Sequence, residues 1–163
     1  AVTRLLEMRI EPYLIASSLV CSIAQRLARR ICRHCSEPDP DIPAFIRDEM
    51  AAALGIPPAE VSARRGRGCV ECNQRGHRGR VAIYEFFLVS QAIADLIQPG
   101  LRTGILREAA RHLGWRSLRE MGWLKVQRGE IPISEQERWT RLIDPAALLT
   151  TPGAALGPHP QSI

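Results

Sequence analysis

Four cysteines stand in two pairs of equal spacing, and their thiols are the side chains of this sequence best suited to bind a metal ion. Cys32 and Cys35 form one Cys-x-x-Cys pair, Cys69 and Cys72 form the other, and 33 residues lie between the pairs. A two-residue gap lets both thiolates of a pair reach one ion at about 2.3 Å, and two pairs complete a tetrahedron around Zn²⁺. Because four thiolates leave no position open for water or substrate, the pattern predicts a structural zinc site and no catalytic residue.

Other residues near the pairs fit a supporting role. Arg30, Arg33, Arg67 and Arg75 lie close to the cysteines in sequence, where they would favour thiolates and offset the two negative charges of a four-thiolate zinc site. His34 and His77 could replace a ligand, but four cysteines suffice, so both histidines are interpreted as exposed polar residues. Cys21 lies in an apolar helix pattern and is interpreted as a small core residue. Free or redox-active thiols are the alternative, but a thiol oxidoreductase would need a βαβ frame that the sequence lacks.

The composition indicates one compact domain or two small ones. The chain has 163 residues, 45% of them hydrophobic and 24% charged, and a formal net charge of +5. Lys125 is the only lysine among 22 basic residues, which indicates a compositional bias and makes basicity a weak argument for nucleic-acid binding. The apolar run 13–24 is shorter than the roughly 20 residues of a membrane span. No export signal opens the sequence, which favours metal binding over disulfide bonds for the paired cysteines. We expect the chain to be a piece of a longer protein.

The first half of the sequence predicts helices around a proline-rich stretch. Residues 3–8 read as the end of a helix, and Pro12 can begin the next one, in which Ala16, Leu19, Ile23 and Leu27 recur at helical spacing. Residues 24–31 could equally form a strand. The proline-rich stretch 37–68 brackets one short helix, Ala44–Leu54, that Gly55 ends.

The second half predicts a strand followed by helices. Gly76 and Gly79 allow a tight turn, after which the β-branched and aromatic run Arg80–Val89 reads as a strand. We expect Ser90 to cap the following helix. The predicted helices are 91–97, 103–112, 117–128 and one beginning near Ser134, with capping boxes at Ser117/Glu120 and Ser134/Glu137. Residues 144–163 read as a flexible tail.

The sequence contains no nucleotide-binding loop. A G-x-x-x-x-G-K-[ST] motif is absent, and Lys125 follows no glycine-rich loop. We therefore expect that this chain does not hydrolyse a nucleotide by itself.

Three blocks of the sequence resemble a known family. "AVTRLLEMRIEPYLIASSLVCSIAQRLARRICRHC", "GCVECNQRGHRGRVAIYEFFLV" and "LREAARHLGWRSLREMGWLKVQRGE" are similar, in this order, to the C-terminal part of the ATPases of type II secretion and type IV pilus assembly (the GspE/PulE/PilB family). The resemblance runs from Ala1 to about Leu142. The chain departs from the family pattern at Arg9, where glycine is usual before "IEPYL", at Met121, where an acidic residue is usual, and in "SEQERWTRL".

The resemblance implies an α+β fold. The parts it implies are the end of a RecA-like ATPase core (1–31), an inserted tetracysteine zinc module (32–75), a strand returning to the core (76–89), a small C-terminal helical domain (90–143) and the tail (144–163). Retraction ATPases of the family lack the cysteines and join the equivalents of Ala24–Ile31 and Arg80–Val89 more directly. The comparison implies that these segments are neighbouring strands and that the zinc module is inserted between them.

The resemblance also implies a function. Family members are cytoplasmic hexamers at the inner membrane that couple ATP hydrolysis to secretion or pilus assembly and contact membrane platform proteins. It makes Cys32, Cys35, Cys69 and Cys72 the ligands of a structural Zn²⁺, whereas the ATP and Mg²⁺ sites lie upstream of Ala1. Nucleic acid is not expected as a partner.

The alternative interpretation is a free-standing zinc-binding nucleic-acid module. Its basis is the set of arginines around the second cysteine pair, at positions 64, 65, 67, 75, 78 and 80. Its weakness is that Tyr84, Phe86 and Phe87, which could stack on bases, fall within a strand expected to be buried. Tryptophans 115, 123 and 139 could mark a partner surface, but are interpreted as anchors that pack the small helical domain.

Overall fold

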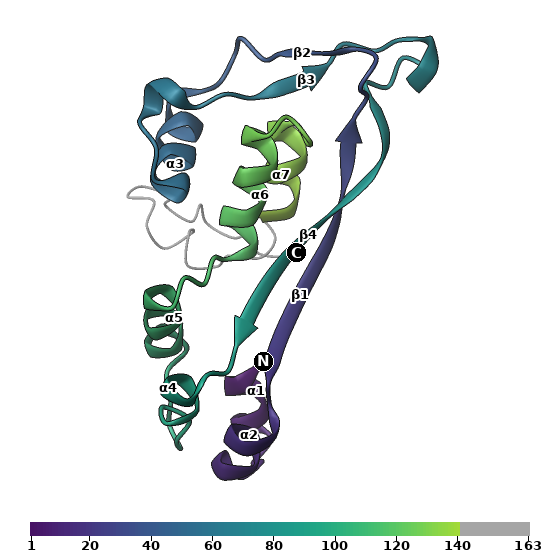
Figure 1. The fold of residues 1–163 in the computed structure, drawn as a ribbon. Helices are drawn as coiled ribbons and strands as arrows, with labels where there is room; N and C mark the ends of the chain where they lie inside the picture. Colours follow the sequence, from purple (N-terminus) through teal and green to yellow (C-terminus); the bar gives the residue numbers. More distant parts are fainter. Residues whose placement is uncertain (141–163) are drawn as a thin grey trace, which may run out of the picture.

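The chain folds as one long pair of antiparallel strands with helices along one face and at one end, in a computed structural model that describes residues 1–140 (Figure 1). The helices are α1 (Val2–Glu7), α2 (Pro12–Ser18), α3 (Ala44–Leu54), α4 (Gln91–Ala94), α5 (Thr103–His112), α6 (Leu118–Gln127) and α7 (Ile133–Thr140). The strands are β1 (Cys21–Ile31), β2 (Ser36–Pro38), β3 (Arg64–Gly66) and β4 (His77–Leu88), with short 3-10 turns η1 (Pro58–Glu60) and η2 (Val70–Cys72). The expected α+β class is confirmed.

The two long strands are neighbours, as the resemblance implied. β1 and β4 pair antiparallel from Cys21 opposite Leu88 to Ile31 opposite His77, so the segment with the cysteine pairs is inserted between adjacent strands. Within this segment β2 and β3 form a second small antiparallel sheet, which crosses the top of Figure 1. β4 begins at His77, three residues before the predicted start. A register irregularity accommodates the extra residues beside Gly79, whose φ of 78° lies in the left-handed region that glycine adopts without steric cost.

The helix predicted from Pro12 onward is shorter than its apolar spacing indicated. It ends at Ser18, and Leu19 is already extended with ψ at 109°. Ile23 and Leu27, which matched helical spacing, lie on β1, so the alternative of a strand over residues 24–31 is the correct one. Cys21 is likewise in the strand and is half-buried, so its interpretation as a helical core residue was wrong. Pairing with β4 overrides the local helical pattern here.

Several helices match their predictions closely. α3 spans Ala44–Leu54 and ends at Gly55, whose φ is 68°, and α5 spans the predicted residues 103–112. The capping box at α6 is present: the Glu120 backbone N–H donates to Ser117 Oγ at 3.3 Å, and the Ser117 N–H donates to Glu120 Oε2 at 2.6 Å. These features are local in sequence, so short-range propensity suffices to specify them.

Other helix ends differ from the predictions. Ser90 is the N-cap of α4 but makes no side-chain capping hydrogen bond, and α4 ends at Ala94, three residues before its predicted end. α7 begins at Ile133, so Ser134 lies inside the helix and cannot be its N-cap. Arg9 adopts a φ of 60°, which explains why glycine suits this position in the family pattern.

Two apolar clusters stabilise the described residues. The larger joins the inner face of the β1–β4 sheet to α3 and α6; its buried members are Ala28, Ile46, Met50, Ala51, Val61, Ala63, Ile83, Trp123, Val126, Ile131 and Ile133. The smaller joins α1, α2, α4 and α5 through Val2, Ile15, Ile93, Ile97, Leu106 and Ala110. Trp123 is fully buried, and Trp115 packs edge-on against Phe87 with ring centroids 6.4 Å apart, so both act as packing anchors. The side chain of Trp139 lies outside the described part of the chain.

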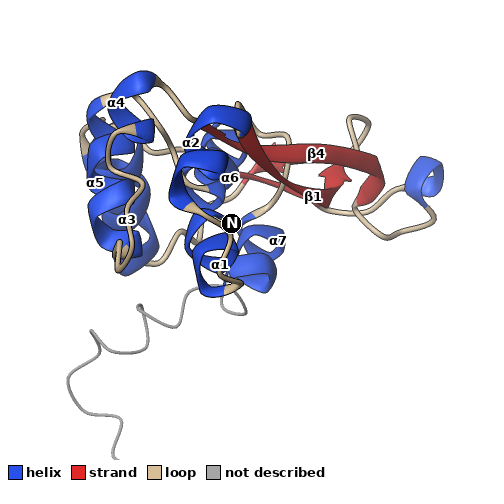
Figure 2. Ribbon diagram, turned by 90° about the horizontal axis from the view of Figure 1, so that it is seen from below, coloured by secondary structure: helices blue, strands red, loops and turns tan. Residues whose placement is uncertain are grey.

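The outer face of the β1–β4 sheet is apolar and exposed. Residues on a strand alternate between faces, and those opposite the inner core face away from the helices. The large side chains on this face are 39–64% exposed: Ile23, Leu27, Tyr84, Phe86 and Leu88. Tyr84 and Phe86 were expected in a buried strand, and this expectation was wrong because the helices cover only one face of the sheet, as Figure 2 shows.

The free edge of β1 is partly covered by the segment that leads into α7. The Ile31 N–H donates to the Glu130 carbonyl at 3.0 Å, and the Arg29 N–H donates to Glu135 Oε2 at 2.7 Å. The Arg29 guanidinium also donates to Glu135 Oε1 at 2.8 Å through Nε. Burial alone raises the pKa of the Glu135 carboxyl group, but the hydrogen bonds and charge of Arg29 outweigh it and lower the pKa below its usual value.

Replacement of Glu135 is therefore expected to make the free energy of unfolding depend less on pH in the acidic range. Because folding lowers its pKa, Glu135 contributes stability above about pH 4.3, and the contribution is lost as pH falls through the folded value. Glu135→Gln should lower the free energy of unfolding at neutral pH by about 1.5–3 kcal/mol, with a smaller difference below about pH 4. Urea unfolding across this range, with exposed Glu7→Gln as the control, measures the effect; a difference that does not change with pH would contradict it.

The remaining expectations concern the ends of the chain and the membrane. Residue 143, the predicted end of the helical domain, and the predicted tail 144–163 lie outside the described residues. Within residues 1–140 no helix is long and apolar enough to cross a bilayer.

Candidate metal centre

The four paired cysteines come together at the end of the β1–β4 sheet. Their sulfur atoms all lie within 4.8 Å of one another, although Cys35 and Cys69 are far apart in sequence. The Sγ distances are 3.8 Å for Cys32–Cys69, 3.9 Å for Cys35–Cys72 and 3.7 Å for Cys69–Cys72. A tetrahedron of thiolates bonded to Zn²⁺ at about 2.3 Å has sulfur–sulfur edges of about 3.8 Å. The arrangement therefore fits a closed four-thiolate metal site.

Burial separates the cluster from solvent. Cys32, Cys35 and Cys72 are at most 5% exposed, and Cys69 is half-buried. Each sulfur is supplied by a loop that follows or precedes a strand: Cys32 comes directly after β1, and Cys72 lies five residues before β4. The pairing of these two strands thus brings the two cysteine pairs together.

Backbone geometry around Cys72 forms a tight knuckle that could present its sulfur to a metal ion. Cys69 directly precedes η2 and Cys72 is its last residue. Asn73 and Gln74 follow with positive φ values of 51° and 59°, which turn the chain back toward the sulfur. The N–H groups of Cys69 and Gly76 both donate to Cys72 Sγ at 3.2 Å. Backbone N–H groups that point at a sulfur stabilise its thiolate form.

The two knuckles are held together by backbone contacts that require glycine. The Cys32 N–H donates to the Gly76 carbonyl at 2.9 Å, and the Arg67 N–H donates to the Cys35 carbonyl at 3.1 Å. A Cβ atom on Gly66 or on Gly76 would collide with the backbone of the other residue. The glycines therefore allow the close approach that places both pairs around one point.

The thiols differ in how readily they ionise. Burial raises the pKa of Cys35 to about 12 and also raises the pKa of Cys69. Burial acts on Cys72 in the same direction, but the N–H groups of Cys69 and Gly76 outweigh it and lower its pKa to about 6. A metal ion must therefore displace protons from Cys35 and Cys69, which makes metal binding weaker in acid.

The histidines are outside this cluster. His34 is exposed, as expected, whereas His77 is half-buried with its Nδ1 2.8 Å from the Arg75 carbonyl, a bond in which the imidazole N–H donates. Among the described residues the only group with metal-ligand spacing consists of the four cysteines. Four ligands complete a tetrahedron, so the arrangement can hold an ion and stabilise the fold, but it offers no open position for substrate.

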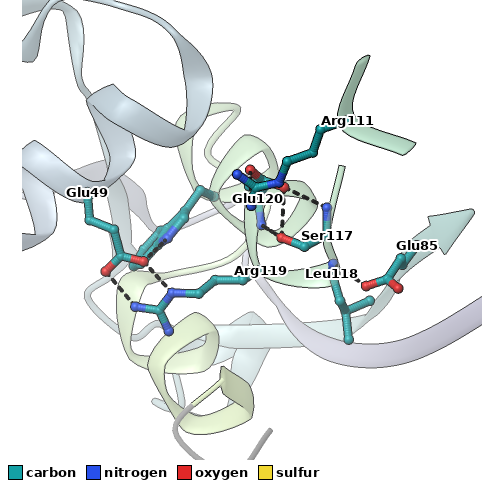
Figure 3. Close-up of polar contacts among 8 residues, drawn as sticks. Glu49, Glu85, Arg111, Ser117, Leu118, Arg119 and Glu120 are labelled. Carbon is teal, nitrogen blue, oxygen red and sulfur yellow. Dashed lines mark hydrogen bonds and ion pairs between the residues drawn. The ribbon is translucent and has the colours of Figure 1, made fainter. Parts of the chain in front are cut away.

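A polar network ties the inserted segment to the C-terminal helices. Figure 3 shows Glu49 of α3 bound by Arg119. The Trp123 indole N–H also donates to Glu49 Oε1, at 2.9 Å. The same view shows Glu85 of β4, which accepts from the Leu118 N–H at 2.7 Å. The first turn of α6 is thus held both by the inserted segment and by the sheet.

Sequence reasoning missed the residues that make this connection. Glu49 and Arg119 are 70 positions apart, and Glu135 and Arg29 are 106 positions apart. An acidic residue on a helix is ordinarily solvent-exposed, so neither glutamate carries a local signal of its partner. Only the folded chain shows which charges are paired.

Comparisons with known proteins find one family. The family model described as "Type II/IV secretion system protein" matches residues 1–138. The chain is 40% identical over 141 residues to the type II secretion system protein HxcR of Pseudomonas aeruginosa. It is 39% identical over 138 residues to the type IV pilus assembly ATPase PilB of Myxococcus xanthus, and 39% identical over 143 residues to the type II secretion system protein E of Pseudomonas aeruginosa.

The matches cover most of this chain and a small part of each relative. The match to HxcR includes 86% of this chain and 26% of HxcR. The match to the Myxococcus PilB includes 82% of this chain and 24% of PilB, and the match to the Pseudomonas protein E includes 86% of this chain and 27% of protein E. The chain therefore spans about a quarter of the length of these relatives.

Proposed function

Because the chain belongs to the type II/IV secretion system protein family, we propose that it is the C-terminal portion of a motor ATPase that energises type II secretion or type IV pilus assembly. This portion supplies a structural zinc site and contacts within the motor. The ATP and Mg²⁺ sites belong to the rest of the longer protein, in keeping with the absence of a nucleotide-binding loop from this sequence.

The exposed apolar face of the β1–β4 sheet carries this proposal. Monomeric proteins rarely expose large contiguous apolar patches, and such patches mark interfaces. Leu27 and Phe86 are 45% and 52% exposed on this face, and the relatives are about four times as long as this chain. The preceding part of a longer polypeptide would cover this face and continue the core.

The cysteine cluster supports a structural role for zinc. Four thiolates are the ligand set that favours Zn²⁺ in a closed tetrahedral site, and the sulfur spacing matches this geometry. In this proposal Cys32, Cys35, Cys69 and Cys72 hold the ion, and the binding free energy stabilises the inserted segment. The motor would act as a cytoplasmic hexamer at the inner membrane, in contact with platform proteins.

A chimeric motor tests the proposal. The segment of HxcR that this chain matches, about a quarter of its length, is replaced by this chain, and hexamer formation and ATP hydrolysis are measured. We expect the chimera to hydrolyse ATP and this chain alone to be inactive. Phe86→Asp, on the outer face of the sheet, should reduce hexamer content and hydrolysis by about tenfold or more, because a charge would be buried in an apolar interface.

The matched control is Phe45→Asp, since Phe45 is 63% exposed on α3, away from the β1–β4 sheet. It should leave both measurements close to those of the unsubstituted chimera. Hydrolysis by this chain alone would refute the assignment of the ATP site to the rest of the protein, and equal losses in the two variants would refute the proposed role of the face.

The nucleic-acid module remains the second candidate because Tyr84 and Phe86 are exposed and could stack on bases. Their ring centroids lie 5.7 Å apart with a tilt of 35°, so the two rings pack against each other rather than standing apart. Salt-dependent binding of an oligonucleotide that Tyr84→Ala abolishes would favour this candidate over the motor.

A further inference from the structure

The end of the molecule that holds the cysteine cluster is rich in arginine. We call residues 30–35 and 66–80 the cysteine tip. Its arginines are Arg30, Arg33, Arg67, Arg75, Arg78 and Arg80, and all but the half-buried Arg30 are exposed. Glu71 is the only acidic residue of the tip, and it pairs with Arg78 at 2.8 Å. Even with the two negative charges of a loaded zinc site, the tip is strongly positive.

Most charges of the tip are not neutralised by the chain itself. Within residues 1–138 the other five tip arginines have no acidic partner within ion-pair distance. Arg65, directly beside the tip, is in contrast surrounded by Glu37, Asp39 and Asp41. The fold therefore neutralises arginine next to the tip but leaves the tip charged.

This charge works against the stability of the fold. Arg80 lies directly opposite Arg29 in the antiparallel register, and like charges in opposite positions destabilise a strand pair. Glu135 neutralises Arg29, but Arg80 has no such partner in the described chain. A concentrated charge with a stability cost is typical of a surface that binds an oppositely charged partner.

The shape of the tip suits docking. η2 projects beyond the end of the sheet, away from the helices (Figure 2), and its Val70 is 83% exposed. The Cys35–Arg67 and Cys32–Gly76 backbone hydrogen bonds, together with the cysteine cluster, hold the loops in one arrangement. A preorganised surface loses little conformational entropy when it binds.

We propose that the cysteine tip is a docking surface for an acidic segment of a partner protein. Arg33, Arg67 and Arg75 pair with its carboxylates, and Val70 contacts an apolar side chain between them. The planar guanidinium fork matches a carboxylate bidentately. The inference rests on the proposed function, since the motor would present the tip to a partner. It adds a binding role for the surface of the tip, to which the proposed function gives only a structural zinc site.

The composition of the tip favours protein over the other polyanions. It contains no Phe, Tyr or Trp, and the His34 imidazole is its only exposed ring, so it offers no platform on which successive unpaired bases could stack. Val70 is its only large apolar side chain with high exposure, and the tip lacks the Trp and Tyr that anchor proteins at a bilayer surface. Carboxylates on a folded or helical protein segment can pair with arginine without a stacking ring or a bilayer anchor.

Binding of a defined acidic peptide to the zinc-loaded chain tests the proposal. The probe is a fluorescein-labelled helical peptide with a glutamate face and a leucine ridge, and the same peptide with glutamine for glutamate is the ligand control. Fluorescence anisotropy at about 50 mM salt, where surface charges are weakly screened, reports the affinity. Arg67→Glu with Arg75→Glu should weaken binding of the acidic peptide by about tenfold or more.

The matched control changes net charge equally at the opposite end of the molecule. Arg102→Glu with Arg116→Glu replaces two exposed arginines of the helical end, and it should change the affinity by less than about twofold. Equal losses in the two double variants would show general charge attraction and refute the docking surface. Tighter binding of an oligonucleotide, or of phosphatidylglycerol vesicles, with the same dependence on Arg67 and Arg75 would also overturn the assignment to protein.

Zinc content, measured for every variant by native mass spectrometry, separates this proposal from the proposed function. If the double glutamate variant loses its metal, Arg67→Gln with Arg75→Gln tests the same contacts with less repulsion. Absence of peptide binding by a zinc-loaded chain refutes the docking surface but leaves the result of the chimeric motor unaffected.

Discussion

Cys69→Ser is expected to abolish tight zinc binding and to unfold the two knuckles while α3 stays packed on α6. Cys69 supplies one corner of the sulfur tetrahedron, 3.8 Å from Cys32 and 3.7 Å from Cys72. Removal of a ligand should weaken zinc binding by more than the roughly 10–100-fold that loss of an outer-shell partner costs. Because the binding energy of a structural zinc is folding energy for its own segment, the loops should lose their order with the ion.

The helices should survive because their packing does not depend on the metal. Met50 of α3 is fully buried in the same cluster as Trp123 of α6, on the inner face of the sheet. Native mass spectrometry should find one zinc per chain in the parent and none in the variant. Limited proteolysis should cut residues 31–37 and 66–76 first and spare α3.

Cys21→Ser is the matched control. Cys21 lies on β1 and is the one cysteine outside the cluster, so its replacement should leave the zinc content at one per chain. A Cys69→Ser chain that keeps its zinc and its protease resistance would contradict the metal centre. Loss of protease resistance in α3 as well would contradict the independence of the helical packing.

Trp123→Ala should cause the largest loss of stability among single substitutions in the helical core. Trp123 is fully buried against α3 and the sheet, and its indole N–H donates to Glu49 at 2.9 Å. Truncation of a buried tryptophan removes apolar contacts, leaves a cavity and takes one hydrogen-bond donor from the half-buried Glu49 carboxylate. We expect a loss of about 3–5 kcal/mol in the free energy of unfolding.

Denaturant unfolding of the zinc-loaded chain, followed by far-ultraviolet circular dichroism, measures this loss. Phe45→Ala is the control, because Phe45 belongs to α3 but is 63% exposed, and its effect should stay within about 0.5 kcal/mol. A Trp123→Ala chain destabilised by less than about 1 kcal/mol would show that the cluster between α3 and α6 contributes little to stability.

Features with a local physical cause were predictable. The bounds of α3 and α5 and the capping box at Ser117 depend on residues within a few positions of one another. The α+β class and the pairing of β1 with β4 followed from the family resemblance rather than from periodicity. Periodicity alone matched Ile23 and Leu27 to a helix and left residues 24–31 open between helix and strand, because the spacing of these apolar residues fits both a helix and a strand whose outer face is apolar.

The candidate metal centre likewise has features that the sequence predicts and features that only the folded chain shows. The spacing of each Cys-x-x-Cys pair names the sulfurs that one knuckle can offer, so the four candidate ligands were readable in the sequence. The positive φ values at Asn73 and Gln74, and the close approach of Gly66 to Gly76, became visible only in the folded chain. The burial that raises the pKa of Cys35 also depends on segments remote in sequence.

The sequence by itself determined the family, the four clustered cysteines and the helices with strong local signals, because these depend on residue types at short, fixed spacings. Tertiary structure alone decided that Glu49 and Glu135 hold the C-terminal helices to α3 and β1, and that one face of the sheet stays open. The physical reason is that burial and ion pairing arise between residues far apart in the chain. Their partners are specified only when the strands pair and the helices pack.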